Sequence, residues 1–248
     1  SVQSEDNIGY AAGNNFGLWV CRQIQPEFFW MINPDIIVPE FYYVSMLNQV
    51  EKYPDHDFFG STIIPAVEQD KAIFCGGEVR LDQGACHLHM GSSLEELPTE
   101  PFECDYLTGA NIFGRSRVLD NVGYLPEDYF LYFEETHWFT EMALLGKSKK
   151  PIVFPNLMVK NHKRSENGHI PSKYYIYYFV RNSLVFGKRF AGDQRHICER
   201  EAQKFADAWL KKIAVRAPGQ LGDYKMLVQK AFTDGAAGLT GRMADLNY

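Results

Sequence analysis

Before Pro171, the hydrophobic positions fall into short continuous runs that are separated by Gly, Pro, Asn and Asp. Runs of this kind, bounded by turn residues, are typical of buried strands, whereas apolar residues recurring at helical spacing predict helices. We therefore expect strands at 27–33, 57–64, 72–81, 152–154 and 157–162, helices at 39–53, 116–123 and 135–145, and a loop over 83–103.

From Pro171 onward, the pattern is purely helical, with helices expected over 172–190, 194–214 and 222–233. Strands mixed with helices, followed by helices alone, indicate an α/β fold with a helical C-terminal extension. We expect the α/β domain to cover residues 1–170 and the extension to cover residues 171–248.

Composition and charge narrow the class of protein. The 248 residues are 46% hydrophobic and 15% aromatic, which suffices for a large core. The chain has no run of apolar residues long enough to span a bilayer, and no secretory signal is expected. A net charge of −6 argues against a general nucleic-acid binder. Five cysteines without a CxxC pair favour a reduced, cytoplasmic setting.

The stretch "NIGYAAGNN" (7–15) is poor in packing residues and rich in glycine and asparagine. Neither a core strand nor a stable helix is expected from it. Glycine lets the backbone approach a ligand closely, and amide side chains supply neutral hydrogen bonds. An ordinary glycine-rich loop is the alternative interpretation. The candidate binding residues in this stretch are Asn7, Gly9, Gly13 and Asn14.

Asn33-Pro34-Asp35 follows the predicted strand at 27–33. Open α/β sheets bind ligands at the carboxyl ends of their strands. A carboxylate there can hold a hard cation, and the cation can neutralise a diphosphate. On position alone, an Asx or proline turn explains the same residues.

Two adjacent carboxylates, Glu134 and Glu135, lie inside the aromatic run "YFLYFEETHWF" (129–139). Aromatic surroundings raise the pKa of a carboxyl group, and the start of a helix lowers it. A carboxyl group whose pKa is set by these two opposing effects can act as a general base. An exposed helix start with two acids fits the same pattern.

Two histidine-containing stretches are candidates for metal binding. His162 follows the apolar run "LMVKN", and a histidine at a strand end can ligate a metal, although most such histidines are structural. Cys86, His87 and His89 crowd one loop, but no second ligand pair stands at a spacing that a zinc site requires.

In their order along the chain, these motifs resemble the bacterial family 2 glycosyltransferases, particularly the rhamnosyltransferase-like branch that builds surface polysaccharides. The likeness covers most of residues 5–243. The matching stretches are "NIGYAAGNN" (7–15), "INPDIIV" (32–38), "LTGANIFGRSRVLDNVGYLPEDYFLYFEE" (107–135), "KNHKRSENG" (160–168), "YYFVRNSLVF" (177–186) and "KAFTDGAAGLTGRM" (230–243).

The resemblance implies a GT-A fold and transfer of a sugar, with inversion, from a nucleotide diphosphate donor to an acceptor hydroxyl. It implies that Asp35 stands for the last acid of the DxD motif of the family and holds Mg²⁺ or Mn²⁺. Asn33 stands at the first acid of that motif, and His162 matches a second metal ligand. Glu135 matches the catalytic base, with Glu134 beside it.

The resemblance also implies the donor contacts. Gly109 and Ala110 would lie near the transferred sugar, and the stretch at 7–15 would run along the nucleotide. Arg181, next to Asn182, would face the donor phosphates. The donor would be dTDP-rhamnose or a UDP-sugar, and the acceptor a saccharide or a lipid-linked oligosaccharide.

Two departures from the family pattern stand out. The family begins about one βαβ unit earlier, with strands that hold the base, so this chain is expected to start in the middle of the domain. The acidic motif has Glu135 where the family has Asp, and His137 and Glu141 replace an acid and an arginine. Because these two positions are i and i+4 on a helix, we expect them to form a structural pair.

Basic residues in "KSKK" (147–150) and "KNHKR" (160–164), with the aromatic helix at 173–190, suggest peripheral docking on the inner face of the membrane. Aromatic residues at helical spacing are also typical of a packing face. Two other functions remain open: a non-catalytic transferase-like module that supports a partner domain, and a nucleotide-sugar hydrolase.

Overall fold

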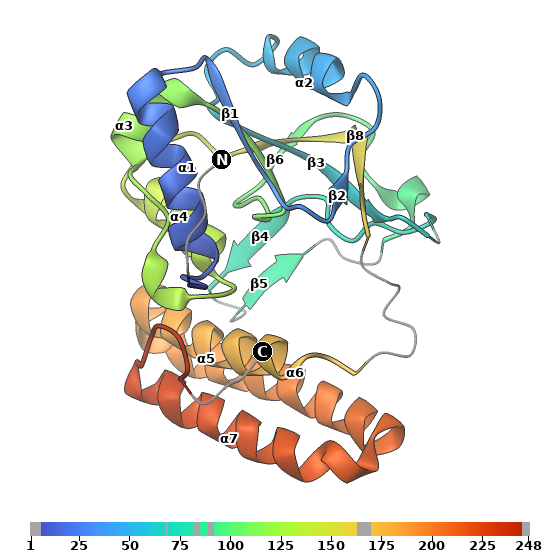
Figure 1. The fold of residues 1–248 in the computed structure, drawn as a ribbon, viewed down its shortest axis with the longest axis vertical. Coiled ribbons are helices and arrows are strands. Elements are labelled where there is room, and N and C mark those ends of the chain that lie inside the picture. The colour runs from blue at the N-terminus through green and yellow to red at the C-terminus, as the bar shows by residue number, and fades with distance from the viewer. Residues whose placement is uncertain (1–5, 68, 82–84, 89–91, 163–169, 245–248) are drawn as a thin grey trace.

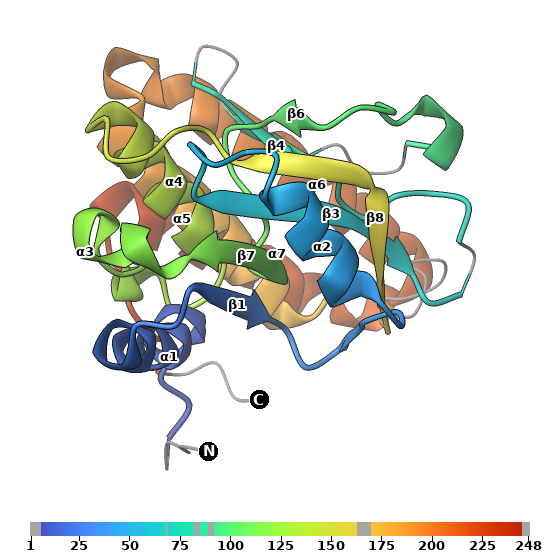
Figure 2. The ribbon, with the colours of Figure 1, turned by 90° about the horizontal axis from the view of Figure 1, so that it is seen from above.

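The computed structural model describes residues 6–67, 69–81, 85–88, 92–162 and 170–244. A six-stranded mixed sheet forms the centre of the molecule, in the order β1-β7-β3-β8-β2, with β6 also pairing with β8 (Figure 2). Only the β3–β8 pair is parallel, and the other pairs of this sheet are antiparallel. The strands are β1 (Phe28–Ile32), β2 (Ile36–Ile37), β3 (Phe58–Pro65), β6 (Phe102–Glu103), β7 (Asn111–Arg115) and β8 (Ile152–Asn161).

Helices lie on both sides of this sheet. In Figure 1, α2 lies above the sheet, α1, α3 and α4 lie to its left, and three C-terminal helices lie together below it. A separate hairpin pairs β4 with β5. The bounds are α1 (Tyr10–Ile24), α2 (Tyr42–Val50), α3 (Leu119–Val122), α4 (Glu134–Leu144), α5 (Lys173–Phe190), α6 (Arg195–Arg216), α7 (Leu221–Ala237), β4 (Gly77–Arg80) and β5 (Ala85–Leu88), with short 3-10 turns at Leu94–Glu96, Ser116–Val118, Glu127–Tyr129, Gly192–Gln194 and Pro218–Gln220.

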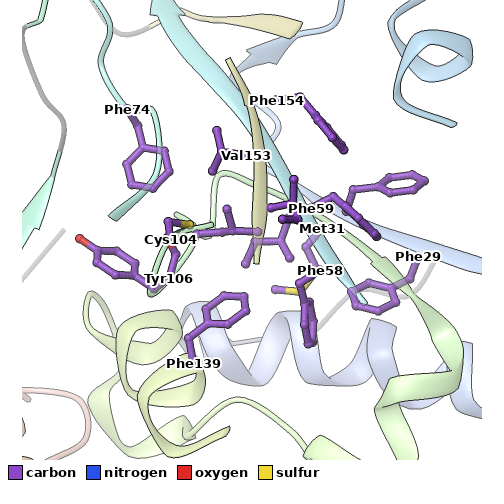
Figure 3. Close-up of a cluster of buried hydrophobic side chains, with 14 of the residues drawn as sticks. Phe29, Met31, Phe58, Phe59, Phe74, Cys104, Tyr106, Phe139, Val153 and Phe154 are labelled. Carbon is purple, nitrogen blue, oxygen red and sulfur yellow. Dashed lines mark hydrogen bonds between the residues drawn. The ribbon is translucent and has the colours of Figure 1, made fainter. Parts of the chain in front are cut away.

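Strand β3 is buried along nearly its whole length because both faces of the sheet are covered. Successive side chains of a strand point to opposite faces, so Phe58 and Phe59 pack on different sides. Phe58 meets Phe139 of α4 edge to face at 5.1 Å between ring centroids, whereas Phe59 stacks on Phe154 at 5.8 Å (Figure 3). The hydrophobic core therefore covers both faces of the sheet.

A buried hydrogen-bond network fixes β7 between β1 and β3. Asn111, at the start of β7, accepts a hydrogen bond from Trp30 Nε1 at 2.8 Å. Its own amide donates to Ser61 Oγ of β3 at 2.9 Å and to the Tyr42 hydroxyl of α2 at 3.2 Å. A buried amide costs stability unless it is satisfied, so this network sets the register at the start of β7.

The expected α/β class, with a mixed sheet flanked by helices, is confirmed. The helices expected at 39–53, 135–145 and beyond Pro171 are present, as are the strands near 27–33 and 57–64. The strands expected at 152–154 and 157–162 are one strand, β8, with a register shift against β3.

Three expectations about local structure were wrong. Most of the 7–15 stretch is helical, because α1 begins at Tyr10. The expected loop over 83–103 contains β5, β6 and a 3-10 turn, and the strand expected over 72–81 is limited to β4. Strand β7 was not predicted. It pairs with two hydrophobic strands across the sheet, and pairing partners are invisible in local sequence.

Helix α5 packs against both α6 and α7, and its aromatic residues Tyr177 and Tyr178 are fully buried. Its aromatic residues therefore form a packing face, which was the alternative interpretation, and docking of the protein on a membrane stays a prediction. Lys149 and Lys150 form ion pairs with Asp55 and Asp105. Among the described residues, no helix has the length and apolarity that crossing a bilayer requires.

Candidate active site

Three motifs that are far apart in the sequence meet at one end of the sheet. The N–H of Asn33, just after β1, donates to the carbonyl of Ala110, just before β7, at 3.1 Å. Strand β2 then pairs with the end of β8, and the N–H of His162 donates to the carbonyl of Asp35 at 2.9 Å. The expected metal-binding residues Asp35 and His162 are thus neighbours through backbone pairing.

Asp35 has one carboxylate oxygen that is buried and has no hydrogen-bond partner in the described part of the chain. Its other oxygen accepts a long hydrogen bond of 3.4 Å from the amide of Asn161. His162 is exposed. Carboxylate oxygen suits Mg²⁺ and Mn²⁺, whereas an imidazole nitrogen suits a transition metal better than Mg²⁺, and a free buried oxygen provides one ligand position. Within the described residues, no cluster of three or more His, Cys, Asp or Glu side chains surrounds such a position.

Gly109 lies between Tyr10 and Glu135. Its N–H donates to Glu135 Oε1 at 3.1 Å, and its carbonyl accepts from the Tyr10 hydroxyl at 2.5 Å. A Cβ at this position would lie 2.3 Å from the Tyr10 hydroxyl oxygen, so only glycine fits. The peptide of Gly109 therefore connects α1 to the carboxylate at the start of α4.

The two glutamates at the start of α4 have different surroundings. Glu134 is completely buried, and neither of its carboxylate oxygens has a partner among the described residues. Glu135 is half-buried. Burial raises the pKa of both groups, and for Glu134 the neighbouring charge of Glu135 raises it further. Two such carboxyls retain a proton at a pH at which an exposed glutamate is ionised.

Two tyrosine hydroxyls border this carboxyl pair. Burial and the two glutamate charges raise the pKa of Tyr132 to about 12. Burial, followed by the charges of Glu135 and Glu134, also raises the pKa of Tyr10. Both phenols are therefore neutral hydrogen-bond donors near the carboxylates.

The segment that leads into α4 has an unusual backbone. Phe130, Tyr132 and Phe133 have positive φ angles of 69°, 67° and 77°. Each such non-glycine residue costs on the order of 1 kcal/mol or more, and surrounding contacts must hold it in place. The carbonyl of Phe130 accepts from the N–H of Tyr10 at 3.0 Å, and that of Phe133 accepts from His137 within α4.

The remaining carbonyls of this segment contact α5. Arg181 donates to the carbonyl of Tyr129 at 2.7 Å. The side-chain amide of Asn182 contacts the carbonyls of Tyr129, Leu131 and Tyr132 at 3.2, 2.7 and 2.9 Å. Every carbonyl from 129 to 133 thus has a partner.

The expected donor-phosphate contact by Arg181 was wrong. Arg181 is only 1% exposed, and its guanidinium also donates to Asn182 Oδ1 at 2.8 Å and to the carbonyl of Gly241 at 2.6 Å. It also lies over the rings of Tyr177 and Tyr178. The sequence could not reveal this role, because its two carbonyl partners, Tyr129 and Gly241, lie 52 residues before it and 60 residues after it.

The expected pairing of His137 with Glu141 was also wrong. The His137 ring nitrogen Nδ1 lies 3.1 Å from the Tyr129 hydroxyl and 3.3 Å from Arg189, and Glu141 is exposed. Arg189 in turn forms an ion pair with Asp128. Burial, then the charge of Arg189, lowers the pKa of His137. This network attaches α4 to the end of α5.

The opening motif contributes to the site through its backbone and through Tyr10. The N–H of Gly9 bonds to Asn7 Oδ1 at 3.1 Å, and a Cβ on Gly9 would lie 2.7 Å from the carbonyl of Phe130. Gly13 faces open space, and the Asn14 amide bonds within α1 to the carbonyl of Tyr10.

Asn15 and Tyr10 were not singled out from the sequence. The buried side chain of Asn15 exchanges two hydrogen bonds of 2.9 Å with the backbone of Leu125 and donates to Glu127 Oε1 at 2.8 Å. Tyr10 is an aromatic residue among glycines and alanines, and this contrast was the signal available for it. His89 and the side chains of Cys86 and His87 lie outside the described part of the chain.

No family model and no curated protein sequence matches the chain. Among solved structures, the chain is similar to the crystal structure of GalNAc-T7 with UDP, GalNAc and Mn²⁺. The two share 12% sequence identity, the TM-score is 0.49, and the match covers 88% of this chain and 46% of that one. The chain therefore spans less than half the length of that protein, and a likeness at this level says nothing about activity.

Proposed function

We propose that the protein is an inverting, metal-dependent glycosyltransferase of the GT-A type that uses a nucleotide diphosphate sugar. The observation that carries the proposal is the meeting of distant motifs at one end of the sheet. Glu135 is hydrogen-bonded to Gly109, the next residue Ala110 to Asn33, and Asp35 to His162. A base and a metal-binding pair on one strand-end edge fit this reaction class.

In the proposed reaction, Glu135 accepts the proton of an acceptor hydroxyl while that oxygen bonds to the anomeric carbon of the donor. The bond from this carbon to the diphosphate oxygen breaks in the same displacement, so one base suffices. The N–H of Gly109 holds the carboxylate in position, and burial raises its pKa so that it accepts a proton more readily. Neutral Tyr10 and Tyr132 border the site without competing for the proton.

A divalent cation held by Asp35 and His162 would neutralise negative charge on the departing diphosphate. The free buried oxygen of Asp35 supports this role. Two protein ligands leave the other positions to diphosphate oxygens and water, as Mg²⁺ and Mn²⁺ sites often do. Asn7, Gly9 and Gly13 remain candidate donor contacts, because the start of α1 lies beside Gly109.

The proposed branch is the rhamnosyltransferase-like one, with dTDP-rhamnose or a UDP-sugar as donor and a saccharide or lipid-linked oligosaccharide as acceptor. We propose that this reaction belongs to surface polysaccharide synthesis and takes place in the cytoplasm. These finer assignments rest on the motif order alone.

The test compares Glu135→Gln with Glu141→Gln, a matched change at an exposed position of the same helix. We expect the first variant to lose about 100-fold or more in turnover and to keep donor affinity, and the second to behave as wild type. A donor at about 100 times its Kd should stabilise the protein by about 2.7 kcal/mol in a thermal-shift screen with Mn²⁺. Substantial transfer by Glu135→Gln would refute the assignment of the base, and donor binding without transfer by wild type would indicate a non-catalytic module.

A further inference from the structure

We infer that Arg181 and Asn182 are positioning residues for the carboxylate pair at the start of α4. They hydrogen-bond to the backbone of residues 129–132 and thereby fix the positions of the Glu134 and Glu135 side chains in the site. This inference rests on the proposed function, because the pair is the proposed base and its neighbour.

The side-chain amide of Asn182 has a fixed orientation. Its Oδ1 accepts from Arg181 Nε at 2.8 Å, so its two N–H groups must face the other way. There they are shared among the carbonyls of Tyr129, Leu131 and Tyr132. Asn182 is completely buried, so no water can replace these donors cheaply.

The carbonyls converge on one amide because the backbone is left-handed at Phe130, Tyr132 and Phe133. Such a backbone persists only where its surroundings determine it fully. A lysine could not replace Arg181, because the planar guanidinium reaches Tyr129, Asn182 and Gly241 with separate N–H groups. The hydrogen bond from Arg181 to the carbonyl of Gly241 also connects α5 to the segment that follows α7.

The same segment is held from the opposite side by α1. The carbonyl of Phe130 accepts from the N–H of Tyr10, whose hydroxyl bonds to Gly109. Gly109 in turn donates to Glu135, which lies two residues after Phe133, the last residue of the left-handed segment. A shift of the backbone of residues 129–132 would therefore move the Glu135 carboxylate away from the N–H of Gly109. Helix α5 thus helps to position the proposed base.

The test uses Arg181→Lys and Asn182→Ala, with Tyr177→Phe as the matched control. Tyr177 is buried on α5 one turn before Arg181, and the control removes its hydroxyl, which donates to Asp234 and interacts with Arg181, while keeping the ring under Arg181. The control thus removes a polar neighbour of Arg181 but keeps every donor to the carbonyls of 129–132. Each variant is assayed at the same interval below its own Tm.

We expect kcat to fall about 100-fold in both positioning variants, since a displacement of about 1 Å at a reacting group has this effect. Donor KM should stay within about threefold, and Tyr177→Phe should keep kcat within about twofold. The acid limb of the pH–rate profile should move towards that of an ordinary carboxyl, because the loosened pair becomes hydrated. Unchanged kcat in the positioning variants, or an equal fall in Tyr177→Phe, would overturn the inference.

Hydrogen exchange of the amides from 131 to 135 gives a readout that needs no activity. These amides should exchange faster in Asn182→Ala than in wild type and should exchange as in wild type in Tyr177→Phe. If wild type transfers no sugar from any donor tested, the proposed function fails, and hydrogen exchange alone tests whether Arg181 and Asn182 hold residues 129–132 in place. Unchanged exchange in Asn182→Ala would overturn the inference.

Discussion

The main-chain N–H of Gly109 donates to the Glu135 carboxylate at 3.1 Å, and this contact joins the start of β7 to the start of α4. The Tyr10 hydroxyl holds the same peptide from the other side. The position of the proposed base therefore depends on a residue without a side chain.

Gly109→Ala should disrupt this arrangement, because the added Cβ would lie 2.3 Å from the Tyr10 hydroxyl oxygen. We expect a loss of about 1–3 kcal/mol in the free energy of unfolding, measured in urea, together with a fall in kcat. Gly17→Ala is the control, because Gly17 lies on α1 beside open space. That variant should gain up to about 1 kcal/mol. A stable, active Gly109→Ala protein would contradict the geometry.

The buried Glu134 should make stability fall as pH rises. Its pKa in the folded protein is raised by burial and then by the charge of Glu135, so the folded state binds the proton more tightly than the unfolded chain does. Its destabilising effect is absent below the unfolded pKa of about 4.3 and grows as pH rises through the folded value. Glu134→Gln should therefore match wild type near pH 4 and exceed it in free energy of unfolding at pH 8. Equal stability of the two proteins at pH 8 would argue against a buried carboxyl there.

The proposed base should also control the pH dependence of transfer. Burial raises the pKa of Glu135, and only its ionised form can accept the acceptor proton. We expect kcat/KM to rise with pH through an apparent pKa above the ordinary range of a glutamate. The profile of Glu141→Gln should be the same as that of wild type. A profile that is flat from pH 5 to pH 8 would contradict the prediction.

Asp35→Asn and His162→Ala should each weaken Mn²⁺-dependent donor binding. Asp35→Asn should leave the free energy of unfolding nearly unchanged without metal, because the buried oxygen that it alters has no partner among the described residues. Thermal shifts with donor, with and without Mn²⁺, measure the effect. Asp120→Asn is the control, since Asp120 pairs with Arg22 at the opposite end of β1. A full Mn²⁺ response in both site variants would exclude this pair as the metal site.

Asn15 tests whether the opening motif is structural as well as functional. Asn15→Ala removes a buried amide and leaves the N–H and carbonyl of Leu125 without these partners. We expect a loss of about 1–3 kcal/mol in the free energy of unfolding. Asn14→Ala should lose less, because the Asn14 amide bonds only within its own helix. Equal losses in the two variants would contradict the structural role of Asn15.

The sequence by itself determined the α/β class, the order of most elements and the positions of the candidate site residues along the chain. Strand β1, ending before Asn33-Pro34-Asp35, and helix α4, beginning at Glu134, follow from local patterns of apolar and turn residues. Such patterns are visible because each depends on neighbours within a few positions along the chain.

The tertiary structure alone decided where long-range contacts overcome the secondary-structure preference of the local sequence, and which distant groups a side chain contacts. Helix α1 forms from a glycine- and asparagine-rich stretch because Asn15 is fixed by Leu125 and Tyr10 by Phe130. Arg181, expected at the donor, instead donates to the carbonyl of Tyr129, 52 residues earlier in the chain. Hydrogen bonds between residues so far apart form only after the chain has folded, so the local sequence carries no trace of the partner.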